Sequence, residues 1–129
     1  MTVAKTALWI AESQMMKETE DIVHMNLDFL PLTTNAFIVE GNSLQIDWES
    51  VVPKNQVSYI MGNPPFVGYS LQSKEQKNDI LSIYVDEKGK PYKTAGKIDY
   101  VAGWYFKAAQ FMQGTAIRTA FVSTNSITQ

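Results

Sequence analysis

The segment Val57-Ser58-Tyr59-Ile60-Met61-Gly62-Asn63-Pro64-Pro65-Phe66 decides how this sequence folds. Its first five residues, 57–61, form a short, mostly apolar run with β-branched and aromatic side chains, which predicts a buried strand. Gly62 and Asn63 follow, and then two prolines. Each proline fixes its own φ and biases the residue before it to extended conformations. The segment is therefore predicted to be a strand that leads directly into a stiff loop.

The rest of the chain alternates helical and strand-like patterns. Apolar residues at helical spacing predict three helices, over residues 3–20, 73–83 and 98–113. Short apolar runs predict two further strands, over residues 36–40 and 117–122. Turn-forming residues predict loops, at residues 31–35 and 86–96. This alternation indicates an α/β fold with a mostly parallel sheet that helices cover on both faces.

Composition restricts the possible functions. The chain has 129 residues, of which 45% are hydrophobic and 19% charged, so it is one folded domain or part of one. It has no cysteine and a single histidine, His24, which excludes disulfides, thiolate metal sites and multi-histidine metal sites. The net charge of −2 disfavours stand-alone binding to nucleic acid. No signal peptide and no membrane-spanning apolar run is present, which favours a cytoplasmic protein.

Positive charge is concentrated in one stretch. Residues 74–97 carry six lysines against four acidic residues. One interpretation is a solvated loop, and the other is a loop that lies near a polyanion.

Asparagine follows each predicted strand. Asn42, Asn63 and Asn125 stand in the polar segments after the strands over 36–40, 57–61 and 117–122. Ligand sites in parallel sheets form at the carboxyl ends of the strands. We therefore expect the site at this edge of the sheet.

The loop Asn63-Pro64-Pro65-Phe66 has the strongest chemical character. Its two prolines remove backbone donors, so the Asn63 side-chain oxygen and nearby carbonyls remain as hydrogen-bond acceptors. Acceptors suit a weakly nucleophilic amine, such as the exocyclic amine of adenine, because they stabilise the positive charge that develops during attack. Phe66 offers an aromatic face for a planar base. The alternative is a rigid loop that only ends a strand.

These residues resemble those of a known family. Gly62-Asn63-Pro64-Pro65-Phe66-Val67-Gly68 is similar to the catalytic fourth motif of S-adenosylmethionine-dependent DNA adenine-N6 methyltransferases. The chain most resembles the MmeI-like, type IIG restriction–modification enzymes. Four other segments match this family, namely residues 4–11, 41–48, 99–106 and 121–129.

The resemblance implies the fold and the partners. Residues 1–129 would be the central part of a Rossmann-like class I methyltransferase domain, without its first two strands, its glycine-rich cofactor motif or a DNA-recognition domain. The parent would be a bacterial cytoplasmic enzyme that uses S-adenosylmethionine to methylate double-stranded DNA with the target adenine flipped out. Without the two strands between 36–40 and 57–61, the isolated chain is expected to be inactive and to self-associate.

The resemblance also implies residue roles. Asn63 would accept from the target amine through its side chain, and Pro64 through its carbonyl. Pro65 completes the catalytic loop, and Phe66 would stack on the flipped adenine.

Five other positions are assigned to the site or to local structure. By resemblance, Asn42 and Ser43 would lie near the adenine ring of the cofactor, whereas the local sequence favours Asn42 as a turn residue after Gly41. Asp47 is expected to cap a helix or turn. Asn125 and Ser126 either line the site or belong to a frayed tail.

Two alternatives remain from the residues alone. RNA and protein-glutamine methyltransferases use a similar loop, although the long insert over 68–97 and the final residues 125–129 favour the DNA enzyme. The other alternative is a non-catalytic interaction module, in which the prolines are structural and Trp9, Trp48 and Trp104 serve packing.

Overall fold

The computed structural model describes residues 2–24 and 37–125. The chain divides into two compact units, Met1–Glu40 and Gly41–Gln129, and each is described by itself. The predicted loop over 31–35 lies outside the described residues. No helix of the described part is both long and apolar enough to cross a membrane.

In the described residues of the first unit, 2–24 and 37–40, there is one helix, α1, over Thr2–Val23. The predicted helix over 3–20 is therefore confirmed and extends three residues further. It ends at His24, which is exposed and has a φ of 54°, a left-handed conformation typical of helix C-termini. The apolar side chains at helical spacing are exposed, as Leu8 at 50% and Met15 at 62% show.

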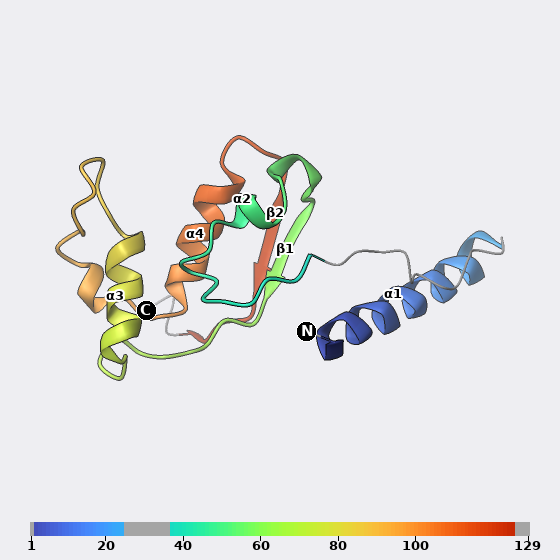
Figure 1. The fold of residues 1–129 in the computed structure, drawn as a ribbon, viewed down its shortest axis with the longest axis horizontal. Helices are drawn as coiled ribbons and strands as arrows, with labels where there is room; N and C mark the ends of the chain where they lie inside the picture. Colours follow the sequence, from blue (N-terminus) through green and yellow to red (C-terminus); the bar gives the residue numbers. More distant parts are fainter. Residues whose placement is uncertain (1, 25–36, 126–129) are drawn as a thin grey trace. The chain divides into compact units, whose positions relative to one another are not determined.

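The second unit is built on a parallel pair of strands (Figure 1). Strand β1 spans Tyr59–Gly62 and strand β2 spans Arg118–Phe121. Tyr59 pairs with Arg118, and Gly62 pairs with Phe121. Both predicted strands are confirmed within two residues, and so is their parallel orientation. The long crossover through helices α3 (Lys74–Ile83) and α4 (Ala102–Met112) makes that orientation possible, since parallel strands cannot be joined by a tight turn.

The predicted strand over 36–40 is wrong for its described residues, because 37–40 adopt no regular structure. Its apolar sequence has high strand propensity, but a strand exists only through hydrogen bonds to a neighbour. The sheet of the described residues consists of β1 and β2 alone.

The helices of the second unit follow local capping signals. Helix α3 spans Lys74–Ile83 and confirms the predicted helix over 73–83. It begins at a capping box, in which the Ser73 side chain accepts from the Gln76 backbone and the Gln76 side chain accepts from the Ser73 backbone. The second unit also contains α2 over Trp48–Val51, the 3-10 turn η1 over Lys54–Gln56 and α4 over Ala102–Met112.

Helix α4 begins four residues later than predicted. Ile98 and Val101 are apolar at helical spacing, but they follow a second 3-10 turn, η2, over Ala95–Lys97. The backbone N–H of Tyr100 donates to the Val67 carbonyl at 2.9 Å. That contact with a distant segment replaces the first helical turn.

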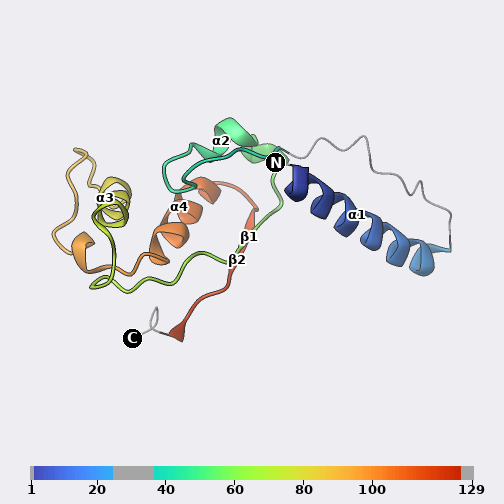
Figure 2. The same cartoon turned by 60° about the horizontal axis from the view of Figure 1, so that its bottom comes forward.

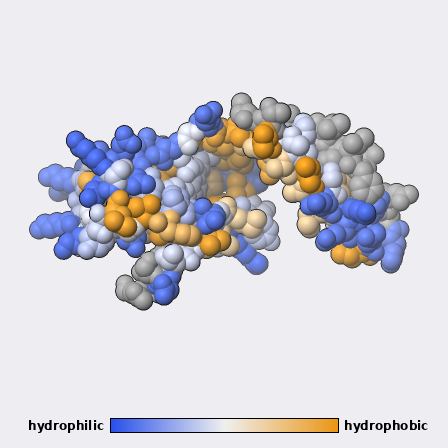
Figure 3. All heavy atoms as spheres, turned by 90° about the horizontal axis from the view of Figure 1, so that it is seen from below, coloured by the Kyte–Doolittle hydropathy of each residue, from blue (hydrophilic) through white to orange (hydrophobic). Residues whose placement is uncertain are grey.

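The predicted loop over 86–96 contains a small hairpin. Val85 and Pro91 form an antiparallel bridge. The Asp86 side chain accepts from the backbone N–H groups of Lys88 and Lys90, each at 2.9 Å. Gly89 completes the turn with a φ of 74°. All six lysines of 74–97 are exposed, and this end of the molecule is largely hydrophilic in Figure 3.

The core lies between α3, the start of α4 and the loop at Leu44. Figure 2 shows α3 on the far side of α4 from the strands. Leu44, Ile80 and Tyr100 form its buried centre. Gly103 lets these elements approach, because an added Cβ there would lie 3.0 Å from Ile80 Cδ1 and 3.2 Å from Leu44 Cδ1.

Within the second unit, helix α4 covers one face of the sheet. It packs there through Tyr105, whose ring meets that of Phe121 edge to face at 5.2 Å. Tyr59 and Met61, on the other face, are 66% and 80% exposed. The expectation that helices cover both faces of the sheet stays a prediction, since the second unit alone supplies a helix on one face.

Candidate active site

The Asn63-Pro64-Pro65 loop begins where β1 ends, as the sequence predicts. It lines a cavity of about 390 Å³ together with Ser43 and the end of β2. Gly62 allows this arrangement, because its bare Cα faces the Phe121 ring, which an added Cβ would approach to 3.3 Å. The residues that line the cavity are Ser43, Trp48, Ile60, Met61, Gly62, Asn63, Pro64, Pro65, Trp104 and Phe121. The expected convergence of polar segments at this edge of the sheet is thus present for the loops at 43 and 63.

Three of the expected site residues lie elsewhere. Phe66 is 45% exposed and does not line the cavity. Asn42 does not line it either, although its neighbour Ser43 does. Asn125 is not among the lining residues, and Ser126 lies outside the described residues.

Asn42 uses its side chain to build a turn. Its Oδ1 accepts from the Leu44 backbone N–H at 3.0 Å, and its carbonyl accepts from the N–H groups of Gln45 and Ile46. Its Nδ2 donates to Asp79 Oδ2 at 2.9 Å. The turn interpretation of Asn42 is confirmed, and its place near a cofactor stays a prediction.

Two tryptophans hold Ser43. The Trp104 Nε1–H donates to Ser43 Oγ at 2.9 Å, and the Trp48 Nε1–H donates to the Ser43 carbonyl at 2.8 Å. Both indole rings also line the cavity. Trp48 and Trp104 therefore fix a loop of the candidate site as well as packing against their neighbours.

A lysine on α4 holds the next part of the same loop. Lys107 Nζ donates to the carbonyls of Leu44, at 2.6 Å, and of Ile46. Burial lowers the pKa of Lys107, and the nearby charge of Asp47 raises it in part. Asp47 itself is the N-cap of α2 and accepts from the Glu49 N–H at 3.1 Å, which confirms the expected capping role.

Sequence reasoning missed Asp79, which is only 4% exposed. Burial raises its pKa, but hydrogen bonds from Tyr100, Asn42 and Gln45 together outweigh burial and lower it below its ordinary value. Burial, followed by the bond to Asp79 and by its charge, raises the pKa of Tyr100 to about 12. The only sequence signal was an acidic residue beside Ile80, a buried position of α3.

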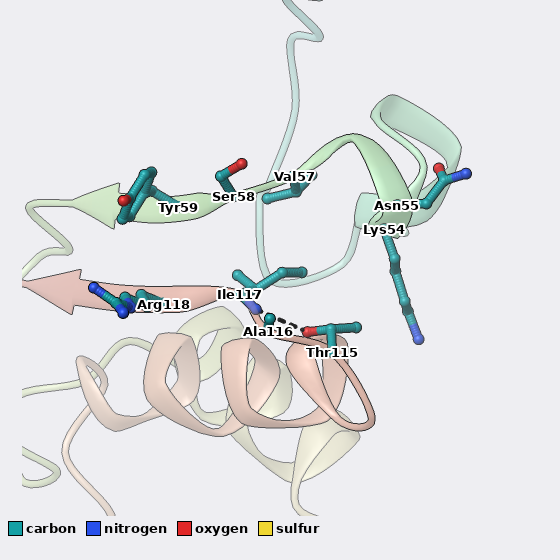
Figure 4. A pocket seen from close by; sticks show the side chains of 9 residues that line it. All are labelled: Lys54, Asn55, Val57, Ser58, Tyr59, Thr115, Ala116, Ile117 and Arg118. Atoms are coloured by element: carbon teal, nitrogen blue, oxygen red, sulfur yellow. Dashed lines mark hydrogen bonds between the residues drawn. The ribbon is translucent and has the colours of Figure 1, made fainter.

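A larger cavity, of about 550 Å³, lies at the opposite ends of the strands. It is lined by the residues labelled in Figure 4, namely Lys54, Asn55, Val57, Ser58, Tyr59, Thr115, Ala116, Ile117 and Arg118. In Figure 4 the Lys54 side chain points away from the strands, and its Nζ lies 3.6 Å from a Glu49 carboxylate oxygen. Parallel sheets form their ligand sites at the carboxyl ends, where the smaller cavity lies.

A family model for the DNA-methyltransferase domain of MmeI matches residues 1–129. This chain belongs to the MmeI family of DNA-methyltransferase domains. The MmeI-like assignment expected from the Asn63–Phe66 loop is thereby confirmed.

Two relatives of this MmeI-family chain support the assignment. DNA methyltransferase A from Bacillus subtilis (strain 168) is 41% identical over 130 residues, which cover 98% of this chain and 14% of the relative. The solved structure of the type IIL restriction-modification enzyme MmeI in complex with DNA is 44% identical and superimposes with a TM-score of 0.76. That match covers 95% of this chain and 16% of the MmeI chain. The chain thus spans about one sixth of the length of either relative.

Proposed function

We propose that this chain is the segment of a longer, S-adenosylmethionine-dependent DNA methyltransferase that presents the target amine to the methyl donor. The observation that carries the proposal is the Asn63-Pro64-Pro65 loop at the carboxyl end of β1, in one cavity with Ser43. The family supports a restriction–modification role. Because the solved relative is described as type IIL, we propose that class for the parent in place of the type IIG class expected from the sequence.

The target of the proposed reaction is N6 of an adenine flipped out of double-stranded DNA. The Asn63 side-chain oxygen and the Pro64 carbonyl accept from the two N–H bonds of the amine. These acceptors stabilise the positive charge that grows on nitrogen as it attacks, which is electrostatic preorganisation rather than general-base catalysis. Phe66, half exposed just beyond the cavity, stacks on the flipped base.

The cavity suits part of the cofactor. S-adenosylmethionine supplies an electrophilic methyl group when it is bound. Ser43 and the rings of Trp48 and Trp104 offer a polar edge and aromatic faces for its adenine. The chain contains no Gly-x-Gly sequence, so the methionine part must be held by another segment of the parent.

The isolated chain is accordingly proposed to be inactive and to self-associate. Among the described residues β1 pairs only with β2, which leaves the other edge of β1 without a ladder partner. The exposed side chains of Tyr59 and Met61 lie next to that edge. Bare edges and apolar sheet faces promote association. A monodisperse monomer in light scattering would contradict this part of the proposal.

The test of the proposed activity is Asn63→Ala in the full-length enzyme that carries this chain. Loss of a preorganised acceptor should lower kcat for methyl transfer to duplex DNA by about 10²-fold or more. The matched control is Asn55→Ala, which removes an exposed amide at the opposite end of β1. Mass spectrometry of the digested DNA identifies the methylated atom.

The outcomes separate the alternatives. Methylated adenine that disappears with Asn63→Ala supports the proposal. If RNA or a glutamine side chain is methylated in place of DNA, the loop performs the same reaction on another substrate. Full activity of Asn63→Ala would show that this loop does not present the target amine. No methyl transfer by the unsubstituted enzyme leaves the interaction module as the better description.

A further inference from the structure

A buried carboxylate joins two parts of the second unit that lie far apart in sequence. Asp79 on α3 accepts three hydrogen bonds from side chains. Gln45 Nε2 donates to its Oδ1 at 2.6 Å, and Asn42 Nδ2 donates to its Oδ2 at 2.9 Å. The Tyr100 hydroxyl also donates to Oδ2, at 2.7 Å. The carboxylate thus binds the turn at 42–45 on one side and Tyr100, two residues before α4, on the other.

Residues 98–100 form hydrogen bonds with residues 67–72, the segment that follows the Asn63–Phe66 loop in the sequence. The Tyr100 N–H donates to the Val67 carbonyl at 2.9 Å, and the Tyr69 N–H donates to the Asp99 carboxylate at 2.8 Å. Gln72 Nε2 donates to the Ile98 carbonyl at 2.7 Å. Three bonds therefore fasten segment 67–72 to segment 98–100.

These contacts form a continuous link between the two loops of the candidate site. It runs from the turn at 42–45 through Asp79 and Tyr100 to Val67, one residue after Phe66. We propose that Asp79 is a positioning residue that fixes the Ser43 loop relative to the Asn63–Phe66 loop, and so sets the distance between the cofactor's adenine side and the target amine. This inference rests on the proposed function.

Asp79 does more than fill space in the core. It lies beside Ile80 in the apolar core, where burial of a charge is costly. Hydrogen bonds from three neutral side chains, those of Asn42, Gln45 and Tyr100, offset this cost. The carboxylate orients the side-chain amides of Asn42 and Gln45, because each amide donates to one of its two oxygens. A leucine would fill the space without selecting either partner.

The first test measures loop order without any cofactor. Asp79→Asn in the full-length enzyme replaces an acceptor-only group with one that donates at one atom, so it cannot accept all three bonds. Hydrogen exchange of the peptide over residues 41–47 should accelerate by about tenfold, because charge-assisted bonds of this kind are worth that much or more. The hairpin over 84–92 should be unchanged. Unchanged protection of 41–47 would overturn the inference.

The second test uses activity and a matched control. Asp79→Asn should raise KM for S-adenosylmethionine about tenfold and lower kcat less. Asp86→Asn is the control, because Asp86 also accepts two hydrogen bonds but does so within the exposed hairpin. An equal effect of both variants, or a fall in kcat alone, would contradict a positioning role for Asp79.

Gln45→Ala keeps the inference testable if Asp79→Asn does not fold. Gln45 is exposed and donates to Asp79, so its removal leaves the core intact. It should raise KM by part of the Asp79→Asn effect, and the double variant should be no worse than Asp79→Asn. Additive effects would show that Gln45 and Asp79 act separately.

If the unsubstituted enzyme binds no S-adenosylmethionine, the proposed function fails. If the unsubstituted enzyme binds the cofactor normally and both variants bind it equally well, only the inference about Asp79 fails.

Discussion

The Trp104 indole N–H donates to the Ser43 hydroxyl at 2.9 Å, across 61 residues of sequence. Trp104 belongs to α4, and Ser43 belongs to a loop with no regular structure. The bond shows how the loop acquires a defined position, since side chains of α4 donate to acceptors of the loop. Lys107, one turn further along α4, does the same for the carbonyls of Leu44 and Ile46.

Trp104→Phe should weaken cofactor binding while preserving packing. The substitution keeps an aromatic ring and removes the N–H, which costs about 0.5–1.5 kcal/mol for a single hydrogen bond. We expect KM for S-adenosylmethionine to rise about two- to tenfold in steady-state kinetics of the full-length enzyme. Ser43→Ala combined with Trp104→Phe should be no worse than the larger single effect, and a fully additive pair would show that the bond is not the cause.

Gly103→Ala should destabilise the core. The new Cβ would lie 3.0 Å from Ile80 Cδ1 and 3.2 Å from Leu44 Cδ1, so both side chains must move. Overpacking of this kind costs about 1–3 kcal/mol, which exceeds the gain in helix propensity of about 1 kcal/mol. Thermal unfolding of the full-length enzyme should show a lower Tm. Gly96→Ala is the control, because no atom lies within 4 Å of its added Cβ.

Tyr100 should make folding weaker at alkaline pH. Its pKa is raised from the ordinary 10.0 to about 12, so the folded state keeps the phenol proton more tightly than the unfolded chain does. The stability from this group is fully present below pH 10 and is lost as the pH rises through about 12. Tyr100→Phe should remove one late-titrating phenol from the near-ultraviolet absorbance and flatten the loss of stability over this range. An unchanged titration would contradict the burial of Tyr100.

Phe66→Ala should impair catalysis with little effect on stability, since the ring is 45% exposed. Base–aromatic stacking is worth about 1–3 kcal/mol, so kcat/KM should fall about tenfold or more, whereas Phe66→Tyr should retain most activity. Fluorescence of 2-aminopurine at the target position reports whether the base is still held out of the duplex. Tyr69→Ala is a matched control, because Tyr69 is 48% exposed in the adjoining segment. Equal losses in both variants would argue against stacking on Phe66.

Local sequence patterns predicted most of the elements and half of the candidate site. The Asn63-Pro64-Pro65 loop, the Asn42 turn and the Asp47 cap depend on neighbouring residues, so they can be seen in the sequence. The strand over 36–40 could not be judged in this way, because its existence depends on a partner strand. The role of Asp79 was also invisible, since its bonds to Gln45 and Asn42 span 34 and 37 residues and leave no periodic signature.

The hairpin over 84–92 has a practical use. It leaves the core between α3 and η2 and returns to it, and its turn is closed by its own Asp86. Gly89 stands at its tip with no atom within 4 Å of where a Cβ would be. An epitope tag or a short peptide inserted there can report on the full-length protein without disturbing the loops of the candidate site.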